Sequence, residues 1–294
     1  MNDHPTVGVL GATSLVGEPL LPLLTAAGWR TVACTRATGL PCGPADGGAS
    51  WCHLGDARPG GETVVATWIA LCPLWALPNQ LAWLESLSIR RLVALSSTSL
   101  ITKRESPDPE ERRVARVLAA TEQTLRAWSI ARGVEVCLLR PTMIYDGVRD
   151  GNVAAIAAFV RRNGWFPVAG PARGRRQPVH AACVAAACVA AISRDSLAPG
   201  YTLSGGAPLP FRDLVAAVFA ACGLPLRIIH VPRPVWNMLL PLARAFGIAE
   251  GVSRGMAARM NDDLVFDHAD AAHDLGFRPR PFALDRLGSE ARSP

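Results

Sequence analysis

The amino-acid sequence predicts an α/β fold with a doubly wound parallel sheet and a smaller, mostly helical lobe in its C-terminal half. In the first half, short runs rich in β-branched residues alternate with amphipathic stretches, which is typical of parallel strands with helices on both faces. From residue 147 onward, helical segments separated by Pro and Gly predominate. The chain has 294 residues, enough for about two domains. We therefore expect a domain of residues 1–146 and a lobe of residues 147–294 packed around a cleft, with the chain free to return to the sheet.

Local signals place the individual elements. The expected strands occupy residues 6–10, 31–35, 50–53, 63–70, 91–96 and 134–139. The expected helices between them occupy residues 15–27, 77–86 and 109–131. Gly28 and Gly133 each follow a helix and precede a strand, where glycine adopts the left-handed backbone at the lowest cost. Helices of the second half are expected at residues 151–164, 180–192, 211–223 and 233–247.

The composition excludes several classes of protein. Half of the residues are apolar and 18% are charged, which excludes a disordered chain and a coiled coil. The formal charge is +6, but the arginines are spread along the chain, with dense groups only at residues 161–162 and 173–176. These groups are too short for a nucleic-acid arm. Nucleic acid is therefore not an expected partner, whereas a small anionic ligand is.

Cysteine usage and hydropathy predict a cytoplasmic protein with no membrane span. The eight cysteines include no C-x-x-C pair and no His grouping at zinc spacing, so we expect reduced thiols and no metal site. The N-terminal sequence lacks the charged and apolar regions of a signal peptide. The longest apolar segment, residues 64–77, contains Pro73 and is too short to cross a bilayer.

A glycine turn near the N-terminus predicts a dinucleotide-binding site of the Rossmann type. Residues 7–17, VGVLGATSLVG, have the pattern of a strand, a tight turn and the start of a helix. In such a turn Gly11 permits the reversal, and Gly17 lets the helix pack on the strand. A small residue at position 14 lets the pyrophosphate approach the backbone. The helix start supplies unpaired N–H groups for the phosphates.

The same turn adds three cofactor-binding candidates and one departure from the usual pattern. Thr13, Leu15 and Val16 complete the stretch that would contact the dinucleotide. Ser14 stands where the pattern has glycine, and its Cβ would loosen the pyrophosphate contact. Glycine for packing alone is the alternative, but a turn that follows the first strand of a βαβ unit favours binding.

Two residues after the second and third strands bear on the choice of cofactor. Arg36 follows the second strand, where an NAD-specific site usually has Asp or Glu for the ribose hydroxyl. A cation there suits the 2′-phosphate of NADP, so we expect NADP rather than NAD. Asp56 follows the third strand, where it would meet the adenine amino group. A solvated arginine and a turn aspartate are the alternatives for these two residues.

Several segments together resemble the short-chain dehydrogenase/reductase superfamily, in the extended form that includes nucleotide-sugar epimerases and dehydratases. The similarity covers nearly the whole chain. It rests on GATSLVG (11–17), RRLVALSSTS (90–99), LAATEQTLRAW (118–128), VCLLRPTMIYDG (136–147), RQPVHAACVAAA (176–187) and YTLSGGAPLPFRDL (201–214). The resemblance implies that residues 1–146 bind a nicotinamide dinucleotide, with Pro141 at the cofactor. It implies that residues 147–294 bind a small-molecule substrate such as a nucleotide sugar.

The family's catalytic residues are only partly matched in this sequence. The resemblance implies a Ser or Thr after the fifth strand and a Tyr-x-x-x-Lys motif on the next helix, whose lysine lowers the pKa of the tyrosine. Thr98 matches the first position. Aligning Glu122 with the glutamate that follows the motif puts Val114 and Leu118 at the dyad. No shift restores the dyad, because Lys103 is the only lysine and the first tyrosine is Tyr145.

Other candidates follow from their place in the resemblance. Tyr145, after the sixth strand, could substitute as an acid, or could be a buried tyrosine with a satisfied hydroxyl. Arg173, Arg175 and Arg176 lie in the loop where nucleotide-sugar enzymes bind the substrate diphosphate, and a solvated basic loop is the alternative. His180 follows that loop as a substrate-side candidate, although a structural histidine is the commoner case.

Two hypotheses about function remain after the residues are considered. The first is an epimerase, dehydratase or reductase that acts on a nucleotide sugar or similar alcohol or carbonyl through non-standard groups. The second is a dinucleotide-binding sensor or structural subunit without turnover, favoured by the missing dyad. The apolar segment at residues 234–248 would pack in the core or make a homodimer contact, since it lacks the charged face of a membrane-surface helix.

Overall fold

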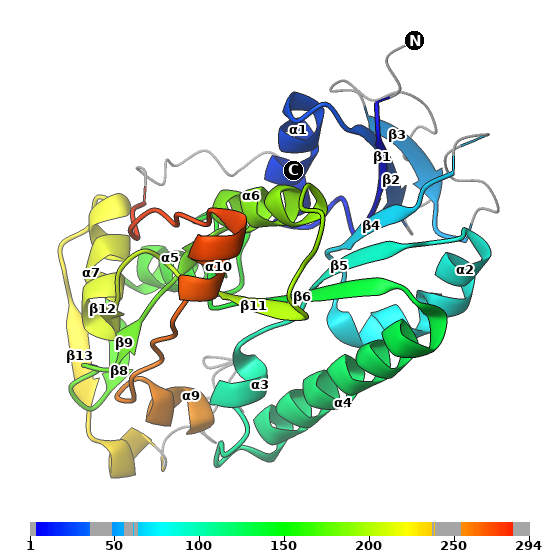
Figure 1. The fold of residues 1–294 in the computed structure, drawn as a ribbon. Helices are drawn as coiled ribbons and strands as arrows, with labels where there is room; N and C mark the ends of the chain where they lie inside the picture. The colour runs from blue at the N-terminus through cyan, green and yellow to red at the C-terminus, as the bar shows by residue number, and fades with distance from the viewer. Residues whose placement is uncertain are drawn as a thin grey trace.

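A parallel seven-stranded sheet forms the centre of the molecule, with helices on both faces (Figure 1). The structure is a computed structural model that describes residues 4–35, 49–55, 61, 64–236, 238 and 254–284. The strand order is β11-β6-β5-β4-β1-β2-β3. The predicted doubly wound α/β fold is confirmed.

The strands of the sheet agree closely with the sequence prediction except at one start. They are β1 (Thr6–Leu10), β2 (Arg30–Thr35), β3 (Ala49–His53), β4 (Thr67–Ala70), β5 (Arg91–Leu95), β6 (Glu135–Pro141) and β11 (Gly200–Leu203). The strand expected from residue 63 begins only at Thr67. The pairing of β4 with its two neighbouring strands also starts there, because Val7 of β1 and Arg91 of β5 lie opposite Thr67.

Apolar side chains hold helices on each face of the sheet. One face packs against α1 (Gly17–Ala26) and α6 (Ala181–Ile192). The other packs against η1 (Leu74–Gln80), α2 (Leu81–Ser86) and α4 (Pro109–Arg132). The helix predicted at residues 77–86 is thus a 3₁₀ segment followed by one short α-helix.

Local chemistry explains where several of these helices break or end. Pro78 lies within η1, and its missing N–H disfavours a continuous α-helix there. The long helix α4 is capped at its N-terminus by Asp108, whose carboxylate accepts the N–H of Glu110 at 3.0 Å. It is capped at its C-terminus by Gly133, which has a left-handed backbone.

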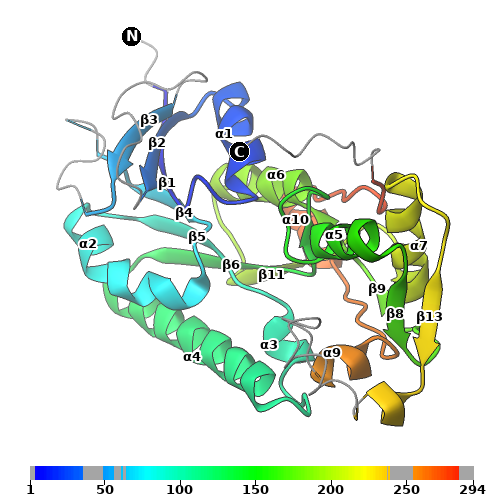
Figure 2. The ribbon, with the colours of Figure 1, turned by 180° about the vertical axis from the view of Figure 1, so that it is seen from behind.

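The second half of the chain both completes the sheet and builds a separate lobe. Strand β11 pairs with β6 at the sheet edge, and α6 covers the same face as α1. The lobe has its own core, in which α5 (Val153–Asn163) and α7 (Phe211–Ala221) pack together (Figure 2). The division at residues 146 and 147 remains a prediction, to which the structure adds this return to the sheet.

Short elements complete the fold. They are α3 (Ser99–Thr102), β7 (Ile144–Tyr145), β8 (Phe166–Ala169), β9 (Arg175–Arg176), β10 (Val179–His180), β12 (Leu209–Pro210), β13 (Ile228–Val231), α9 (Arg254–Arg259) and α10 (Ala269–Leu275). Strands β8 and β13 pair in parallel, as do β7 and β10, whereas β9 and β12 pair antiparallel. The sequence did not predict these short pairs.

The apolar segment expected at residues 234–248 lies largely outside the described residues. Within its described part, Trp236 is buried in the lobe core, whereas Val235 and Met238 are exposed. In the part of the chain that the structure describes, no helix is long and apolar enough to cross a bilayer.

A buried ion pair fixes α4 against the end of the sheet. The Glu122 carboxylate accepts hydrogen bonds from Arg140 Nε at 2.8 Å, from Arg140 Nη2 at 2.6 Å and from Ser96 Oγ at 2.6 Å. Burial alone would raise the pKa of Glu122, but the hydrogen bonds from Arg140 and Ser96 outweigh it and hold the pKa below its usual range. The network ties β5, β6 and α4 together where the candidate site begins.

Replacing Glu122 by Gln should therefore lower the free energy of unfolding, by roughly 3 kcal/mol at pH 7 if the pair behaves as buried pairs usually do. Because the native pKa is depressed, the wild-type advantage is fully present above the ordinary pKa of about 4.5 and is lost as the pH falls through the native value. Urea unfolding of both proteins at a series of pH values measures how far the difference between their free energies of unfolding decreases in acid. Exposed Glu110 on the same helix provides the control, since Glu110→Gln should change the stability by under about 0.5 kcal/mol. A stability gap that does not narrow in acid would contradict the assignment.

Candidate functional site

The turn between β1 and α1 is closely packed at two glycines. Gly11 has a φ of 77°, and a Cβ there would lie 2.9 Å from the backbone nitrogen of Cys72 at the end of β4. A Cβ on Gly17 would overlap the carbonyl oxygen of Ala12. Only glycine fits at either position, so the turn is held against the sheet as the sequence pattern requires.

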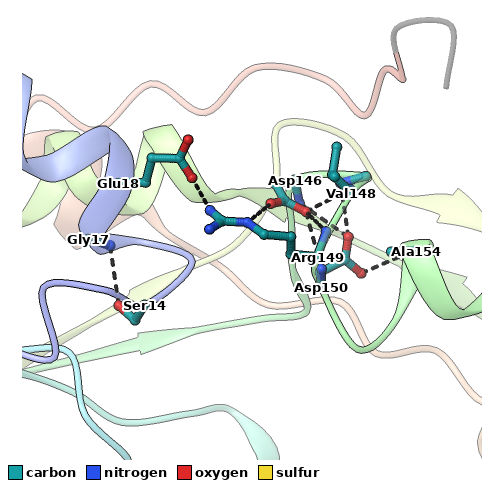
Figure 3. Close-up of polar contacts among 9 residues, drawn as sticks. Ser14, Gly17, Glu18, Asp146, Val148, Arg149, Asp150 and Ala154 are labelled. Carbon is teal, nitrogen blue, oxygen red and sulfur yellow. Dashed lines mark hydrogen bonds and ion pairs between the residues drawn. The ribbon is translucent and has the colours of Figure 1, made fainter. Parts of the chain in front are cut away.

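Ser14 takes part in the turn itself. Its backbone N–H donates to the Gly11 carbonyl at 2.9 Å, and its Oγ accepts the backbone N–H of Gly17 at 3.2 Å (Figure 3). N–H groups at a helix start are the ones that bind phosphates. The Gly17 N–H also donates to the Ser14 backbone carbonyl at 2.9 Å, so it is bound within the turn whatever side chain stands at position 14.

A first cavity of about 490 Å³ opens beside this turn. It lies at the carboxyl ends of β1, β2 and β4, where the chain order of the sheet reverses on either side of β1. This switch point is where open α/β sheets bind ligands. The cavity is lined by Leu10, Gly11, Thr13, Ser14, Cys34, Thr35, Leu54, Leu71, Cys72, Pro73, Trp75, Ala76 and Gln80.

A second cavity, of about 480 Å³, lies at the carboxyl ends of β5 and β6 and is closed by the lobe. Its sheet side carries Leu15, Ser96, Ser97, Thr98, Ser99, Thr102, Lys103, Pro141, Thr142, Met143 and Ile144. Its lobe side carries Asp150, Gly151, Asn152, Arg176, Gln177, Phe211, Met256, Arg259, Met260, Leu264 and Phe266.

The two cavities meet at the turn, because Ser14 lines the first and Leu15 lines the second. An extended molecule of two nucleotides could cross the turn with one end in each cavity. Gly11, Thr13 and Ser14 lie in the first cavity, and Leu15 and Pro141 in the second. The Val16 side chain points into the core and is 3% exposed, so only its backbone can face a ligand. Arg36 and Asp56 lie outside the described residues.

Hydroxyl groups gather at the end of β5, but two of them already have acceptors. Thr98 is 6% exposed, and its Oγ1 donates to the Pro141 carbonyl at 3.2 Å. Ser96 donates to Glu122 at 2.6 Å. A hydroxyl has one proton to donate. Thr98 can therefore accept a hydrogen bond from a ligand while it keeps this bond, but it can donate only by giving it up.

The positions that align with the family's dyad do not face the second cavity. Val114 is 37% exposed, and Leu118 is buried in the core between α4 and the sheet. Helix α4 lies wholly within the described residues, and none of its side chains lines this cavity. The short helix α3 supplies the polar groups instead.

Lys103, directly after α3, lines the second cavity. Burial lowers the pKa of its ammonium below the ordinary value, and Arg259 adds to this, whereas Glu111 and Asp108 oppose it. Arg259 is itself bound to the buried Glu111 carboxylate, with Nη2 to Oε1 at 2.7 Å. Ser106 donates to the same carboxylate at 2.6 Å.

Only one of the three arginines predicted at the substrate reaches the second cavity. Arg173 is exposed, and Arg175 is an exposed ion-pair partner of Asp263 at 2.7 Å; neither lines the cavity. Arg176 lines it, is 8% exposed, and donates to the carbonyls of Arg175 and Asp262, each at 2.8 Å, and of Arg259. Burial, aided by the charge of Arg259, lowers the pKa of Arg176 to about 10, so it stays cationic at neutral pH.

Tyr145 and His180 pack against each other outside both cavities. Their ring centroids are 5.1 Å apart, and Phe282 lies edge-on to the Tyr145 ring at 4.9 Å. Tyr145 is 1% exposed, burial raises its pKa, and its hydroxyl accepts the Ala283 N–H at 3.3 Å. The His180 Nδ1 accepts the Ala182 N–H at 3.0 Å and caps α6. The geometry thus matches the structural alternative for both residues.

A loop after β7 links the lobe to α1 and was missed from the sequence. Arg149 pairs with Glu18 on α1, and its Nε lies 3.6 Å from Asp146 (Figure 3). Burial alone would raise the pKa of Asp146, but N–H groups of Arg149 and Val148 lower it below its usual range.

Asp150, in the same loop, lies on the cavity wall but is fully occupied by backbone. It accepts N–H groups of Gly147 and Asn152, each at 2.9 Å, and of Val153 and Ala154 at the start of α5. The sequence of this loop could have predicted a helix cap, but it does not indicate that Asp150 lines a cavity.

The sequence of the chain has few matches among known proteins, whereas its fold matches solved structures. No model of a known protein family matches the sequence. A protein of Sinorhizobium fredii named "Uncharacterized protein y4nG" is 26% identical over 180 residues, which are 61% of this chain and 45% of that protein. The chain thus matches less than half the length of this relative.

Solved structures match nearly the whole chain. UDP-glucose 4-epimerase from Thermotoga maritima, solved with UDP-glucose, has a TM-score of 0.65 at 14% identity and covers 93% of each chain. MoeE5 with UDP-glucuronic acid and NAD has a TM-score of 0.65 at 19% identity, and RMD from Pseudomonas aeruginosa with NADPH has 0.61 at 16%. Each of these two covers 94% of both chains. The chain therefore shares its fold with these solved structures.

Proposed function

We propose that this chain binds NADP in preference to NAD and transfers hydride to or from a nucleotide sugar or a similar alcohol or carbonyl compound. The observation that carries the proposal is the pair of nearly equal cavities that meet at the glycine turn, on the ligand-binding edge of the sheet. The chemistry would use groups other than the Tyr-x-x-x-Lys dyad.

The residues around the turn fit a dinucleotide. The adenosine half would lie in the first cavity against Gly11, Thr13 and Ser14, and the nicotinamide half in the second against Leu15 and Pro141. A bound nicotinamide supplies a carbon that accepts or returns a hydride. The start of α1 would face the pyrophosphate with its N–H groups.

The lobe side of the second cavity suits an anionic substrate. Arg176 reaches the cavity with its charge retained, and Arg259 borders the same wall. Their guanidinium groups are held by carbonyls and by Glu111, so they would act on a diphosphate chiefly through their charge and any N–H groups left open. Arg173 and Arg175 would act only on the part of a substrate that extends beyond the cavity.

Thr98 would position the reacting hydroxyl or carbonyl as a hydrogen-bond acceptor. Tyr145 and His180 would support the lobe rather than the reaction, because their polar atoms bind backbone N–H groups. A cytoplasmic location accords with the seven described cysteines, which form no disulfide. A homodimer contact at exposed Val235 and Met238 is a further part of this proposal.

A second candidate function is a dinucleotide-binding sensor or structural subunit. The observation that favours it is the inward face of α4, where Leu118 packs in the core instead of offering a lysine. Both candidates require the cofactor, so binding and turnover are measured separately.

Fluorescence titration should show tighter binding of NADPH than of NADH. Replacing Arg36 by Gln should weaken NADPH binding by roughly 10-fold or more, because an arginine–phosphate contact contributes about 1.5–3 kcal/mol. NADH binding should not change. Exposed Arg30, at the start of β2, provides the control through Arg30→Gln. Equal affinity of the wild type for NADPH and NADH would contradict the proposed role of Arg36. The absence of a saturable fluorescence signal would contradict the binding of a dinucleotide.

Replacing Ser14 by Gly should tighten NADPH binding by roughly 10-fold, because it removes the Cβ and hydroxyl that stand where the pyrophosphate approaches the turn. Ser14→Ala removes the hydroxyl but keeps the Cβ, so it separates the two effects. Calorimetry on the three proteins measures them. If Ser14→Gly binds NADPH no better than the wild type, the Ser14 side chain does not hinder the pyrophosphate.

Turnover on a panel of nucleotide sugars distinguishes the two candidate functions. Thr98→Val should lower kcat by about 10²-fold or more, since it removes the acceptor at the reacting group. Tyr145→Phe should lower the stability by about 1 kcal/mol while leaving kcat within a few-fold. Silence of the wild type across the panel, with NADPH bound, would favour the sensor or structural subunit.

A further inference from the structure

The only lysine of the chain lies where a proton could reach a substrate. Helix α3 is a single turn, and residues four apart on a helix share a face. Thr98 and Thr102 form one such pair, and Ser99 and Lys103 form the other. All four line the second cavity. A sequence with 30 basic residues thus places its one lysine on the wall of the same cavity as Thr98, which matches the catalytic threonine.

The side-chain amine of Lys103 is uncommitted among the residues that the structure describes. No hydrogen bond or ion pair joins it to any of them, although its backbone N–H donates to the Ser99 carbonyl at 3.0 Å. The charged groups that face it are Glu111 and Asp108 from α4 and Arg259 from α9. The Glu111 carboxylate is bound by Arg259 and Ser106, so it acts on the Lys103 amine through its charge and not through a hydrogen bond.

Several other polar groups of the cavity are already bound to protein groups. The Thr98 hydroxyl donates its hydrogen bond to the Pro141 carbonyl, and the Ser96 hydroxyl donates its own to the Glu122 carboxylate. Asp150 is saturated by backbone N–H groups. The guanidinium groups of Arg176 and Arg259 donate to backbone carbonyls and to the Glu111 carboxylate. Among the described ionisable groups of this cavity, the amine of Lys103 is the one that remains.

We infer that Lys103 is the catalytic residue that exchanges a proton with the substrate hydroxyl or carbonyl at this site, in place of the family's tyrosine. The inference rests on the proposed function. In the oxidising direction, the neutral amine takes the hydroxyl proton, and the O–H electron pair forms the carbonyl bond. The C–H bond would break with its two electrons, and a bound oxidised nicotinamide would accept them as hydride. In the reducing direction, the ammonium returns the proton to the alkoxide oxygen.

The environment of Lys103 suits this task. An amine with the ordinary pKa of 10.5 is almost wholly protonated at neutral pH and is a poor base. Burial and Arg259 lower that pKa, while Glu111 and Asp108 limit the change. A group so placed could serve as a base in one direction and as an acid in the other.

The single lysine allows a direct test without an assay. Protein made with lysine labelled at the ε-carbon with ¹³C gives one lysine signal, which can be titrated by NMR. The control is Arg104→Lys, which introduces a second lysine at an adjacent, exposed site. The Lys103 signal should titrate at a lower pH than the introduced lysine, and it should shift when NADPH is added. A Lys103 midpoint equal to or above that of the introduced lysine would overturn the inference.

Variants of Lys103 separate proton transfer from charge. Lys103→Met and Lys103→Arg should both keep the NADPH dissociation constant within a few-fold, and both should lower kcat by roughly 10²-fold or more. Activity retained in Lys103→Arg would show that a fixed charge suffices and would overturn the role in proton transfer. If the wild type itself fails to bind NADPH, the proposed function fails. If NADPH binds but its addition leaves the Lys103 signal unmoved, only this inference fails.

Discussion

The close approach of the β1–α1 turn to the rest of the sheet determines where a ligand can lie. Gly11 brings the turn within Cβ distance of the backbone at the end of β4, and Gly17 seats α1 on Ala12. The turn therefore stands between two cavities instead of filling either. Across it, Arg149 of the loop after β7 pairs with Glu18 of α1 at an exposed position.

The chemistry of the second cavity depends on how its polar groups are already used. Helix α4 faces the sheet with Leu118 and Leu125 and commits Glu122 to Arg140, which leaves none of its side chains for a ligand. The end of β5 and the single turn of α3 take over the cavity wall. The polar groups that line this cavity therefore come from elements other than α4.

The sequence predicted the sheet, its helices and the glycine turn because these depend on local patterns: alternation, capping residues and glycine at a tight reversal. Such patterns also carried the resemblance, and the solved structures bear out the fold. The short pairs β7 with β10 and β9 with β12 could not be predicted, because two-residue strands have no periodicity. The absence of the usual dyad needs only the residue count, since a chain with one lysine and two tyrosines at these positions cannot form it.

The partners of the site residues were beyond the reach of local sequence. Glu111 binds Arg259 across 148 positions, and nothing near either residue signals the other. Arg173 and Arg175 looked equivalent to Arg176, yet only Arg176 turns inward, because backbone carbonyls of the segment after α9 bind its guanidinium. Tyr145 looked available after β6, but the lobe core covers it. Burial and long-range pairing decide these cases.

In the proposed complex, a dinucleotide crosses the turn and its nicotinamide lies beside Lys103. A nuclear Overhauser measurement between NADPH and protein whose one lysine is ¹³C-labelled tests this arrangement. We expect contacts from the nicotinamide ring protons to the Lys103 side chain and none from the adenine protons. Saturable binding with contacts from the adenine, or with no contact to Lys103, would contradict it.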